Sequence, residues 1–242
     1  MTIRVAVAGA AGRTGRAVAA GLHRAEGIEL VSGLALETGD LGEMLGQGNW
    51  SVPVYRCSAD ILGRGEIDVW VDFTLGHVAG KHALEALKAG VRPVVGATGI
   101  PQGDMEAIKI TCREQGLGGA VVPNFCIGSH LMSEMVQRAA NVYKKASVVE
   151  IHHDQKLDAP SGTALRLQAQ IRSGGIEDMD VHSLRLPGFL AHHLALFGSE
   201  GESLTVRHDI IDRQAFVPGV ILAIRGVLEA DRLITDLGQL MD

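Results

Sequence analysis

Two adjacent histidines, a lysine and a Ser-Gly-Thr turn lie within one short stretch of the chain, residues 150–164 (EIHHDQKLDAPSGTA). The pattern predicts a strand that runs into His152 and His153, a loop that carries Lys156, and a helix capped by Ser161. The free N–H groups at a helix start attract anions, an ammonium adds positive charge, and an imidazole exchanges protons near neutral pH. The stretch therefore predicts a carboxylate-binding site beside a proton donor.

The same stretch also has a purely structural interpretation. A Ser-Gly-Thr turn caps many helices, surface lysines are mostly solvated, and neighbouring histidines on a strand point to opposite faces. On spacing alone both interpretations stay open, and the choice between them depends on the rest of the chain.

A glycine-rich turn follows the first predicted strand. Residues 3–8 (IRVAVA) form an apolar run that is typical of a strand buried on both faces of a parallel sheet. Gly9, Gly12 and Gly15 come next, and Val18, Leu22 and Ala25 then recur at helical spacing. Glycines at such positions allow a tight turn and close approach of the backbone to a pyrophosphate. The segment predicts a dinucleotide-binding turn, although its G-x-x-G-x-x-G spacing is a modest signal alone.

The second apolar run, residues 28–36, ends at Glu37. In a doubly wound nucleotide-binding domain this position carries the carboxylate that binds the ribose hydroxyls. Glu37 would favour NADH over NADPH, whereas Arg13 in the glycine turn could tolerate a 2′-phosphate. We expect NADH to be preferred, with dual use possible. A solvated glutamate in the turn ETGD, and a solvent-facing arginine, are equally compatible with the sequence.

Strand and helix patterns alternate up to residue 125, which predicts a parallel sheet with right-handed crossovers. Three of these strands end in turn residues: 72–74 (DFT), 96–99 (GATG) and 123–125 (PNF). Ligands of open α/β sheets bind beyond the carboxyl ends of the strands, so these turns should line the nicotinamide side of the site.

The pattern changes after Asn124 to helix, strand, loop and helix, followed by strands at 181–186 and 203–211. We expect a Rossmann-type α/β domain formed by residues 1–123 and 213–242. Residues 124–212 should form a smaller α+β domain with a mixed or antiparallel sheet, which binds substrate and makes subunit contacts. The final segment is expected to be helical and to pack back onto the first domain.

Composition excludes several classes of protein. A chain of 242 residues with a net charge of −6 and no basic tracts gives no electrostatic footprint for nucleic acid. No signal peptide and no apolar run long enough to cross a bilayer is evident, so no membrane association and a cytoplasmic location are expected. The cysteines, Cys57, Cys112 and Cys126, are odd in number and widely spaced, which disfavours disulfides and structural zinc.

Together, the motifs GAAGRTG, VDFT, GATG, PNF and E-x-H-H-x-x-K-x-D-A-P-S-G-T resemble those of the 4-hydroxy-tetrahydrodipicolinate reductases. This family, also called dihydrodipicolinate reductases, acts in diaminopimelate and lysine biosynthesis. Blocks at 182–193, 204–209 and 212–220 are similar to later family blocks in the same order. The resemblance implies an oxidoreductase that reduces a small dicarboxylic substrate with NADH or NADPH.

The resemblance also implies roles for individual residues and a homotetramer built by the sheet domain. His152 would act as general acid, Lys156 would pair with the charged substrate, and His153, Gly162 and Thr163 would bind that substrate. The implied cofactor-binding residues are Gly9, Ala10, Ala11, Gly12, Arg13, Thr14, Glu37, Gly96, Ala97, Thr98, Val122, Pro123, Asn124 and Phe125.

Some positions depart from the family pattern. Gln155 replaces a frequent basic residue and Asp154 adds an acid, which would make the field around the substrate less positive. Ala97 stands where threonine is common, and the segment between Thr163 and His182 is short, which we interpret as a trimmed loop.

Three other functions compete with this interpretation. The first is a different Rossmann oxidoreductase. A short-chain dehydrogenase is disfavoured because no Tyr-x-x-x-Lys exists. A semialdehyde dehydrogenase would require a nucleophilic cysteine, and Cys126, the sole cysteine near the predicted cleft, is interpreted as a small buried thiol. A nucleotide-sensing module would be expected to carry a partner-binding segment, and none is visible. Metal-dependent hydrolysis by the scattered histidines is disfavoured because there is no HExxH motif, so no metal is expected.

Overall fold

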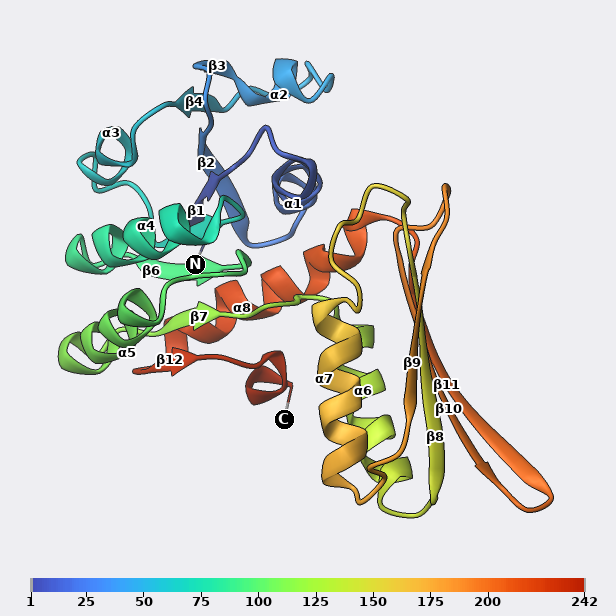
Figure 1. Ribbon diagram of the computed structural model, residues 1–242. Coiled ribbons are helices and arrows are strands. Elements are labelled where there is room, and N and C mark those ends of the chain that lie inside the picture. Colours follow the sequence, from blue (N-terminus) through green and yellow to red (C-terminus); the bar gives the residue numbers. More distant parts are fainter. Residues whose placement is uncertain (1, 242) are drawn as a thin grey trace. The chain divides into compact units, whose positions relative to one another are not determined.

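The protein is described by a computed structural model over residues 2–241, and its chain divides into two compact units (Figure 1). One unit contains the chain up to Cys126 and again from Phe216 onward, and the other is Ile127–Ala215. The first unit ends at Cys126 and the second at Ala215, each three residues later than the expected boundaries at 123 and 212.

The first unit is built on an eight-stranded sheet in the order β12-β7-β6-β5-β1-β2-β4-β3. All neighbouring strands are parallel except β3 and β4. The strands are β1 (Ile3–Ala8), β2 (Ile28–Leu34), β3 (Gly39–Asp40), β4 (Pro53–Tyr55), β5 (Val69–Asp72), β6 (Arg92–Val95), β7 (Gly119–Val121) and β12 (Leu233–Ile234).

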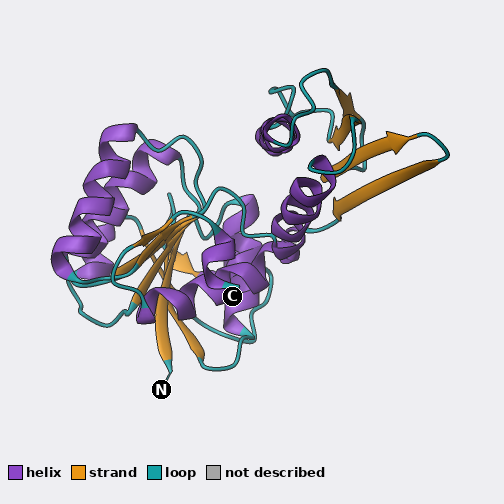
Figure 2. Cartoon of the chain, turned by 90° about the horizontal axis from the view of Figure 1, so that it is seen from below, coloured by secondary structure: helices purple, strands orange, loops and turns teal. Residues whose placement is uncertain are grey.

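Helices lie on both sides of this sheet (Figure 2), as expected for a doubly wound α/β fold. They are α1 (Arg13–His23), α2 (Leu41–Met44), α3 (Ser58–Leu62), α4 (Gly76–Lys88), α5 (Gln102–Gln115) and α8 (Val217–Glu229). The strands are buried accordingly: Val5 to Ala8 and Val69 to Val71 have no exposed surface. Helix crossovers cover both faces, which is why these strands are continuously apolar.

Two expectations for this unit were wrong in detail. Helix α1 ends at His23, so Ala25 lies outside the helix although it continues the apolar spacing. The C-terminal segment is not helical throughout, because β12 pairs in parallel with β7 and a short 3₁₀ helix (Leu237–Leu240) follows. The C-terminal segment thus completes the sheet as well as covering it.

The second unit is a four-stranded mixed sheet with two helices packed on one face (Figure 1). Its strand order is β11-β10-β8-β9, with β9 parallel to β8 and the other pairs antiparallel. The elements are α6 (Ile127–Ala140), β8 (Lys145–His152), α7 (Gly162–Ser173), β9 (Asp180–Arg185), β10 (Ala191–Ser199) and β11 (Glu202–Ile210). The sequence pattern did not predict β10.

Apolar residues of both helices and of the sheet form the core of this unit. Val136 of α6 and Leu167 and Ile171 of α7 contribute fully buried side chains, which pack with Val148 and Phe197 of the sheet. The packing fixes the start of α7 against the sheet, close to the carboxyl end of β8.

No helix within residues 2–241 combines the length and the apolar character that crossing a bilayer requires. The three cysteines are free; Cys57 is exposed, and Cys112 and Cys126 are buried.

Candidate active site

A row of polar residues crosses the second sheet near the end of β8. Glu150 lies opposite Ser183 of β9 and His193 of β10, and His193 in turn lies opposite His208 of β11. Residues at such register positions share one face of the sheet. Glu150 and His193 are buried, so the row belongs to the interior of the unit.

The strand, loop and helix predicted for residues 150–164 are present. Strand β8 ends at His152, so His153 lies beyond the strand and only half-buried, and its carbonyl oxygen accepts the Lys156 N–H at 3.1 Å. Ser161 caps α7, because its hydroxyl oxygen accepts the Ala164 N–H at 3.2 Å. The structure therefore brings His152 and the start of α7 together at one end of the sheet.

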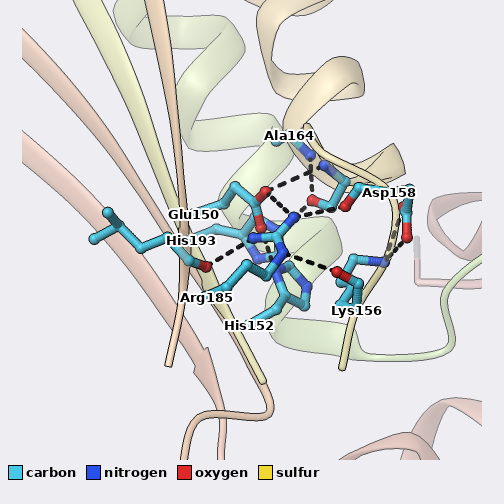
Figure 3. Close-up of polar contacts among 9 residues, drawn as sticks. Glu150, His152, Lys156, Asp158, Ala164, Arg185 and His193 are labelled. Atoms are coloured by element: carbon cyan, nitrogen blue, oxygen red, sulfur yellow. Dashed lines mark hydrogen bonds and ion pairs between the residues drawn. The ribbon is translucent and has the colours of Figure 1, made fainter. Parts of the chain in front are cut away.

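Glu150 connects these parts (Figure 3). One carboxylate oxygen faces Nδ1 of His152 in a short hydrogen bond. The other oxygen accepts hydrogen bonds from Nη2 of Arg185 at 2.8 Å and from the backbone N–H of Ser161 at 3.3 Å. Glu150 has no exposed surface, so all of these contacts form away from water.

The pKa values of this cluster follow from burial and from these contacts. Burial lowers the pKa of His152, as do the positive charges of Lys156 and Arg185, and Glu150 counteracts them only in part. Burial alone would raise the pKa of Glu150, but the hydrogen bond from Arg185, the positive charges of Arg185 and His152 and the other hydrogen bonds to the carboxylate together lower the carboxyl pKa. Glu150 is therefore ionised at neutral pH.

His193 completes the cluster from β10. Its ring meets the ring of His152 edge-on, with centroids 5.2 Å apart, and its Nε2 lies 3.2 Å from the Ser161 hydroxyl. Burial and the neighbouring His152 lower the pKa of His193 to about 4. His193 is thus neutral at pH 7, and its unprotonated Nε2 can accept the hydroxyl hydrogen of Ser161.

Glu150, Arg185 and His193 were missed by the sequence interpretation. The two-residue spacing of Glu150 and His152 on a strand does indicate a shared face. Arg185 and His193, however, reach the site through strand pairing with β8 across long stretches of chain, which a single sequence does not reveal.

The predicted anion-binding groups lie at the start of α7 and on the preceding loop. Gly162 is exposed and Thr163 is half-buried, both in the first turn of the helix. Lys156 lies between them and His152 in sequence, and its ammonium contacts both carboxylate oxygens of Asp158, at 2.7 and 2.9 Å. Uncapped N–H groups and one ammonium could hold a carboxylate.

Glu150, His152 and His193 each offer a possible metal-ligand atom, and these atoms lie within 4.8 Å of one another. The carboxylate of Glu150 is already committed to Arg185, Ser161 and His152, and the arginine cation opposes a second cation. We therefore interpret the cluster as one that handles protons and anions.

The predicted cofactor residues of the first unit lie in turns that touch one another. Gly9 has a φ of 74°, and a Cβ there would lie 2.9 Å from the carbonyl oxygen of Phe73. A Cβ on Gly96 would collide with the Phe73 ring. That ring packs edge-on against the ring of Phe125, with their centroids 5.9 Å apart. The turns after β1, β5, β6 and β7 thus meet at the carboxyl ends of neighbouring strands.

The glycine turn fits a dinucleotide pyrophosphate. A Cβ on Gly15 would collide with the carbonyl oxygen of Gly9, so only glycine allows α1 to approach β1 this closely. Gly12 caps α1 without a side chain, and the first turn carries no acidic residue, which leaves N–H groups for an anion. Ala10 is buried and Thr14 half-buried, while Ala11, Gly12 and Arg13 are exposed.

The remaining cofactor candidates surround this turn. The N–H groups of Gly9 and Ala10 bond to the carbonyl oxygen of Leu34 at 2.9 and 3.1 Å, so the exposed Glu37 follows a strand end beside the glycine turn. Val122 bonds to the carbonyl oxygen of Val95 at 3.0 Å. The exposure of the other candidates varies: Ala97 is buried, Thr98 and Pro123 are exposed, and Asn124 is half-buried.

Asp72 is a further residue whose role the sequence did not indicate. Its fully buried carboxylate accepts hydrogen bonds from the Thr74 N–H at 2.8 Å, the Thr74 hydroxyl at 2.6 Å and Trp70 Nε1 at 3.0 Å. Nδ1 of His82 lies 2.8 Å from the same carboxylate. Asp72 thereby fixes the turn whose Phe73 contacts the glycine turn.

Two family models match nearly the whole chain. The one described as "Dihydrodipicolinate reductase, N-terminus" matches residues 3–125, and the one described as "Dihydrodipicolinate reductase, C-terminus" matches residues 128–241. The chain belongs to the dihydrodipicolinate reductase family. The resemblance inferred from the sequence motifs is confirmed, as is the Rossmann-type fold with a smaller mixed-sheet unit.

Members of the dihydrodipicolinate reductase family align with this chain from end to end. The 4-hydroxy-tetrahydrodipicolinate reductase of Symbiobacterium thermophilum is 38% identical over 97% of this chain and 96% of its own length. That of Halalkalibacterium halodurans is also 38% identical, over 99% of this chain and its full length. A dipicolinate-bound dihydrodipicolinate reductase from Paenisporosarcina sp. TG-14 has a TM-score of 0.85 at 33% identity, with 99% of each chain covered.

More distant structures share the fold alone. An amine dehydrogenase from Mycobacterium smegmatis has a TM-score of 0.69 at 12% identity, over 98% of this chain and 95% of that chain. Among these relatives, the function of this protein is therefore inferred from the reductase family alone.

Proposed function

We propose that this protein reduces 4-hydroxy-tetrahydrodipicolinate, through dihydrodipicolinate, to tetrahydrodipicolinate with NADH or NADPH, in diaminopimelate and lysine biosynthesis. The observation that carries the proposal is the full-length relationship to 4-hydroxy-tetrahydrodipicolinate reductases, joined to a cluster of proton-donating and anion-binding groups. The Paenisporosarcina reductase binds dipicolinate, a planar ring of the same dicarboxylate class.

Substrate recognition rests on paired anion-binding groups. The backbone N–H groups of Gly162 and Thr163, with the Thr163 hydroxyl, bind one carboxylate. The ammonium of Lys156 offsets the substrate charge once it leaves Asp158, and His153 adds a contact from the loop. Binding in this way orients the ring and stabilises its negative charge.

The glycine turn, Glu37, the turn 96–98 and residues 122–125 bind the coenzyme. A bound reduced nicotinamide supplies the hydride that is transferred to C4 of the substrate ring. Glu37 accepts hydrogen bonds from the ribose hydroxyls and repels a 2′-phosphate, so NADH is the preferred coenzyme and NADPH the weaker one.

His152 supplies the proton that balances the arriving hydride. Its pKa is lowered in the free protein, and a doubly negative ring placed beside it raises that pKa again, because opposite charge favours the imidazolium. Substrate binding therefore favours the protonated form of His152, which is the form that can donate a proton. A positioned acid contributes a factor of roughly 10² to 10⁴ in rate.

The second unit, beyond substrate binding, also makes the contacts of a homotetramer, and the enzyme works in the cytoplasm. Both statements rest on the family relationship. Analytical ultracentrifugation tests the first, since a monomer or dimer at working concentration contradicts it.

A coupled assay tests the reaction. Substrate is generated from pyruvate and aspartate semialdehyde, and the fall in NADH absorbance is followed after this protein is added. Oxidation that requires both the generated substrate and this protein supports the proposal. Absence of oxidation with either coenzyme, from a protein with a cooperative unfolding transition, rules the reaction out.

A further inference from the structure

The two carboxylate oxygens of Glu150 serve two different parts of the site. One oxygen holds Nδ1 of His152, and the other holds Arg185 and the backbone N–H of Ser161. A single buried side chain thus contacts both the proton donor (Figure 3) and Ser161, which caps the anion-binding helix.

We propose that Glu150 is a positioning residue of the reaction, which fixes the His152 imidazole and the Ser161 turn in one mutual arrangement. The inference rests on the proposed function, since it assigns a role within the same site. Because Glu150 has no exposed surface, it acts through His152 and Ser161.

The first part of this role is orientation of the imidazole. A hydrogen bond from Nδ1–H to the carboxylate selects one tautomer, and ring orientation follows from the same bond. Nε2 has no hydrogen-bond partner among residues 2–241 and is the nitrogen left for proton transfer. A buried carboxylate that orients a histidine in this way also stabilises the imidazolium that forms.

The second part is electrostatic. His152 is faced by Glu150 on its own strand, Arg185 on β9, Lys156 on the loop and His193 on β10. Arg185 and Lys156 are cations, and His193 is neutral at pH 7 because burial lowers its pKa to about 4. Glu150 is the anion of the group, and it opposes the loss of the proton that burial and the cations favour.

The third part is the coupling to the anion-binding turn. The Ser161 N–H is bound by Glu150 and the Ser161 hydroxyl by Ala164 and His193. Arg185, held by Glu150, also donates to the carbonyl oxygens of Lys156 at 3.3 Å and of Asp158 at 2.6 Å. The Glu150–Arg185 pair therefore fixes the middle and the C-terminal end of the loop between His152 and α7.

The test compares two substitutions that should shift the pKa of His152 in opposite directions. Activity requires the protonated imidazole, so kcat/KM falls as the pH rises through its pKa. Glu150→Gln removes the anion, which should move this fall to lower pH and reduce kcat by roughly 10- to 10²-fold. Arg185→Gln removes a cation, which should move the fall to higher pH.

Two further variants separate positioning from structural support. Glu150→Asp keeps the charge and should restore the pH profile more fully than it restores kcat. Asp209→Asn is the matched control, because it breaks the 2.7 Å contact between a carboxylate and His192 Nδ1, elsewhere on the same sheet. We expect the pH profile of Asp209→Asn to equal that of the parent.

Nitrogen NMR of the imidazole provides a readout that needs no turnover. We expect the Nδ1-protonated tautomer of His152 in the parent and a change of tautomer population in Glu150→Gln. An Nε2-protonated parent, or profiles that do not move in either variant, would overturn the role of Glu150. A parent that shows this tautomer but does not oxidise NADH would instead overturn the proposed function. Should Glu150→Gln fail to fold, the parent tautomer and Arg185→Gln decide the question.

Discussion

Lys156 donates to both carboxylate oxygens of Asp158, two residues further along the same loop, at 2.7 and 2.9 Å. The exposed fraction is 22% for the lysine side chain and 61% for the Asp158 side chain, so the pair lies at the surface of the unit. In the proposed reaction this ammonium is the counter-charge of the substrate. Asp158 therefore competes with the substrate for the same cation.

Asp158→Asn should tighten substrate binding. An exposed ion pair contributes about 0.2–1 kcal/mol, so releasing Lys156 should lower KM by roughly 1.5- to 5-fold with kcat within about twofold. Initial rates over a range of substrate concentrations measure this. Asp178→Asn removes the same charge from an exposed pair with Lys145, at the start of β8 and away from the site, and should leave KM unchanged. A raised KM in Asp158→Asn would instead show that the aspartate holds Lys156 in its binding position.

Lys156→Ala should reduce both turnover and substrate affinity, because an anionic ligand loses its main counter-charge. Lys145→Ala is the matched control, since Lys145 is an exposed lysine at the start of β8, the strand that leads into the Lys156 loop, and its ammonium lies 3.7 Å from the Asp178 carboxylate. Steady-state kinetics of the two variants should differ clearly. Values of KM and kcat within about twofold of the parent for Lys156→Ala, which is under about 0.5 kcal/mol, would contradict the role of Lys156.

His152→Gln should lower kcat by roughly 10²- to 10⁴-fold while KM changes little, because the proton donor is lost and the anion-binding groups remain. The exposed His182 on β9 offers the control, and His182→Gln should keep full turnover. If His152→Gln retained the kcat of the parent, another group would have to deliver the proton.

Much of this site could be predicted from local patterns in the sequence. The run Ile3–Ala8 and its glycine turn were predictable, because burial on both faces and a tight turn each leave a mark on consecutive residues. The stretch around His152 and Lys156 was predictable for the same reason, since a strand end, a loop and a helix cap are all local features.

The unpredicted parts depend on pairing between distant strands. Strand β10 mixes histidines and a glycine with apolar residues, so its alternation is weak, and its place beside β8 is set by the register of His193 with Glu150. β12 is two residues long and is specified by its neighbour β7. Nothing in the local sequence around Arg185 indicates a role in the site, and it is the pairing of β9 with β8 that places it opposite His152.

Glu37→Gln should raise kcat/KM for NADPH by about tenfold or more, which is ~1.4 kcal/mol, because it removes the charge that repels a 2′-phosphate. The NADH value should fall, since the neutral amide is a weaker acceptor for ribose hydroxyls. Glu29→Gln neutralises an exposed glutamate near the other end of β2 and should change neither value. A parent that already prefers NADPH strongly would show that Glu37 does not contact the ribose.

Asp72→Asn should destabilise the first unit by about 1–3 kcal/mol at pH 7, because a buried, ionised acceptor with several donors becomes a neutral amide. Burial alone would raise the pKa of Asp72, but hydrogen bonds from His82, Thr74 and Trp70 lower it below its usual value of 3.8. A carboxyl with a lowered pKa contributes its full stabilisation above the unfolded-state pKa and loses it as the pH falls through the folded-state pKa.

The difference in unfolding free energy between the parent and Asp72→Asn should therefore be constant near neutral pH and should shrink below about pH 4. Urea unfolding at a series of pH values measures it. Asp68→Asn is the comparison, because its ion pair with Arg4 at 2.9 Å is partly exposed and should contribute at most about 1 kcal/mol. A difference for Asp72→Asn that grows as the pH falls would mean that this carboxyl is protonated in the folded protein, and the turn at Phe73 would then be held by a neutral acid.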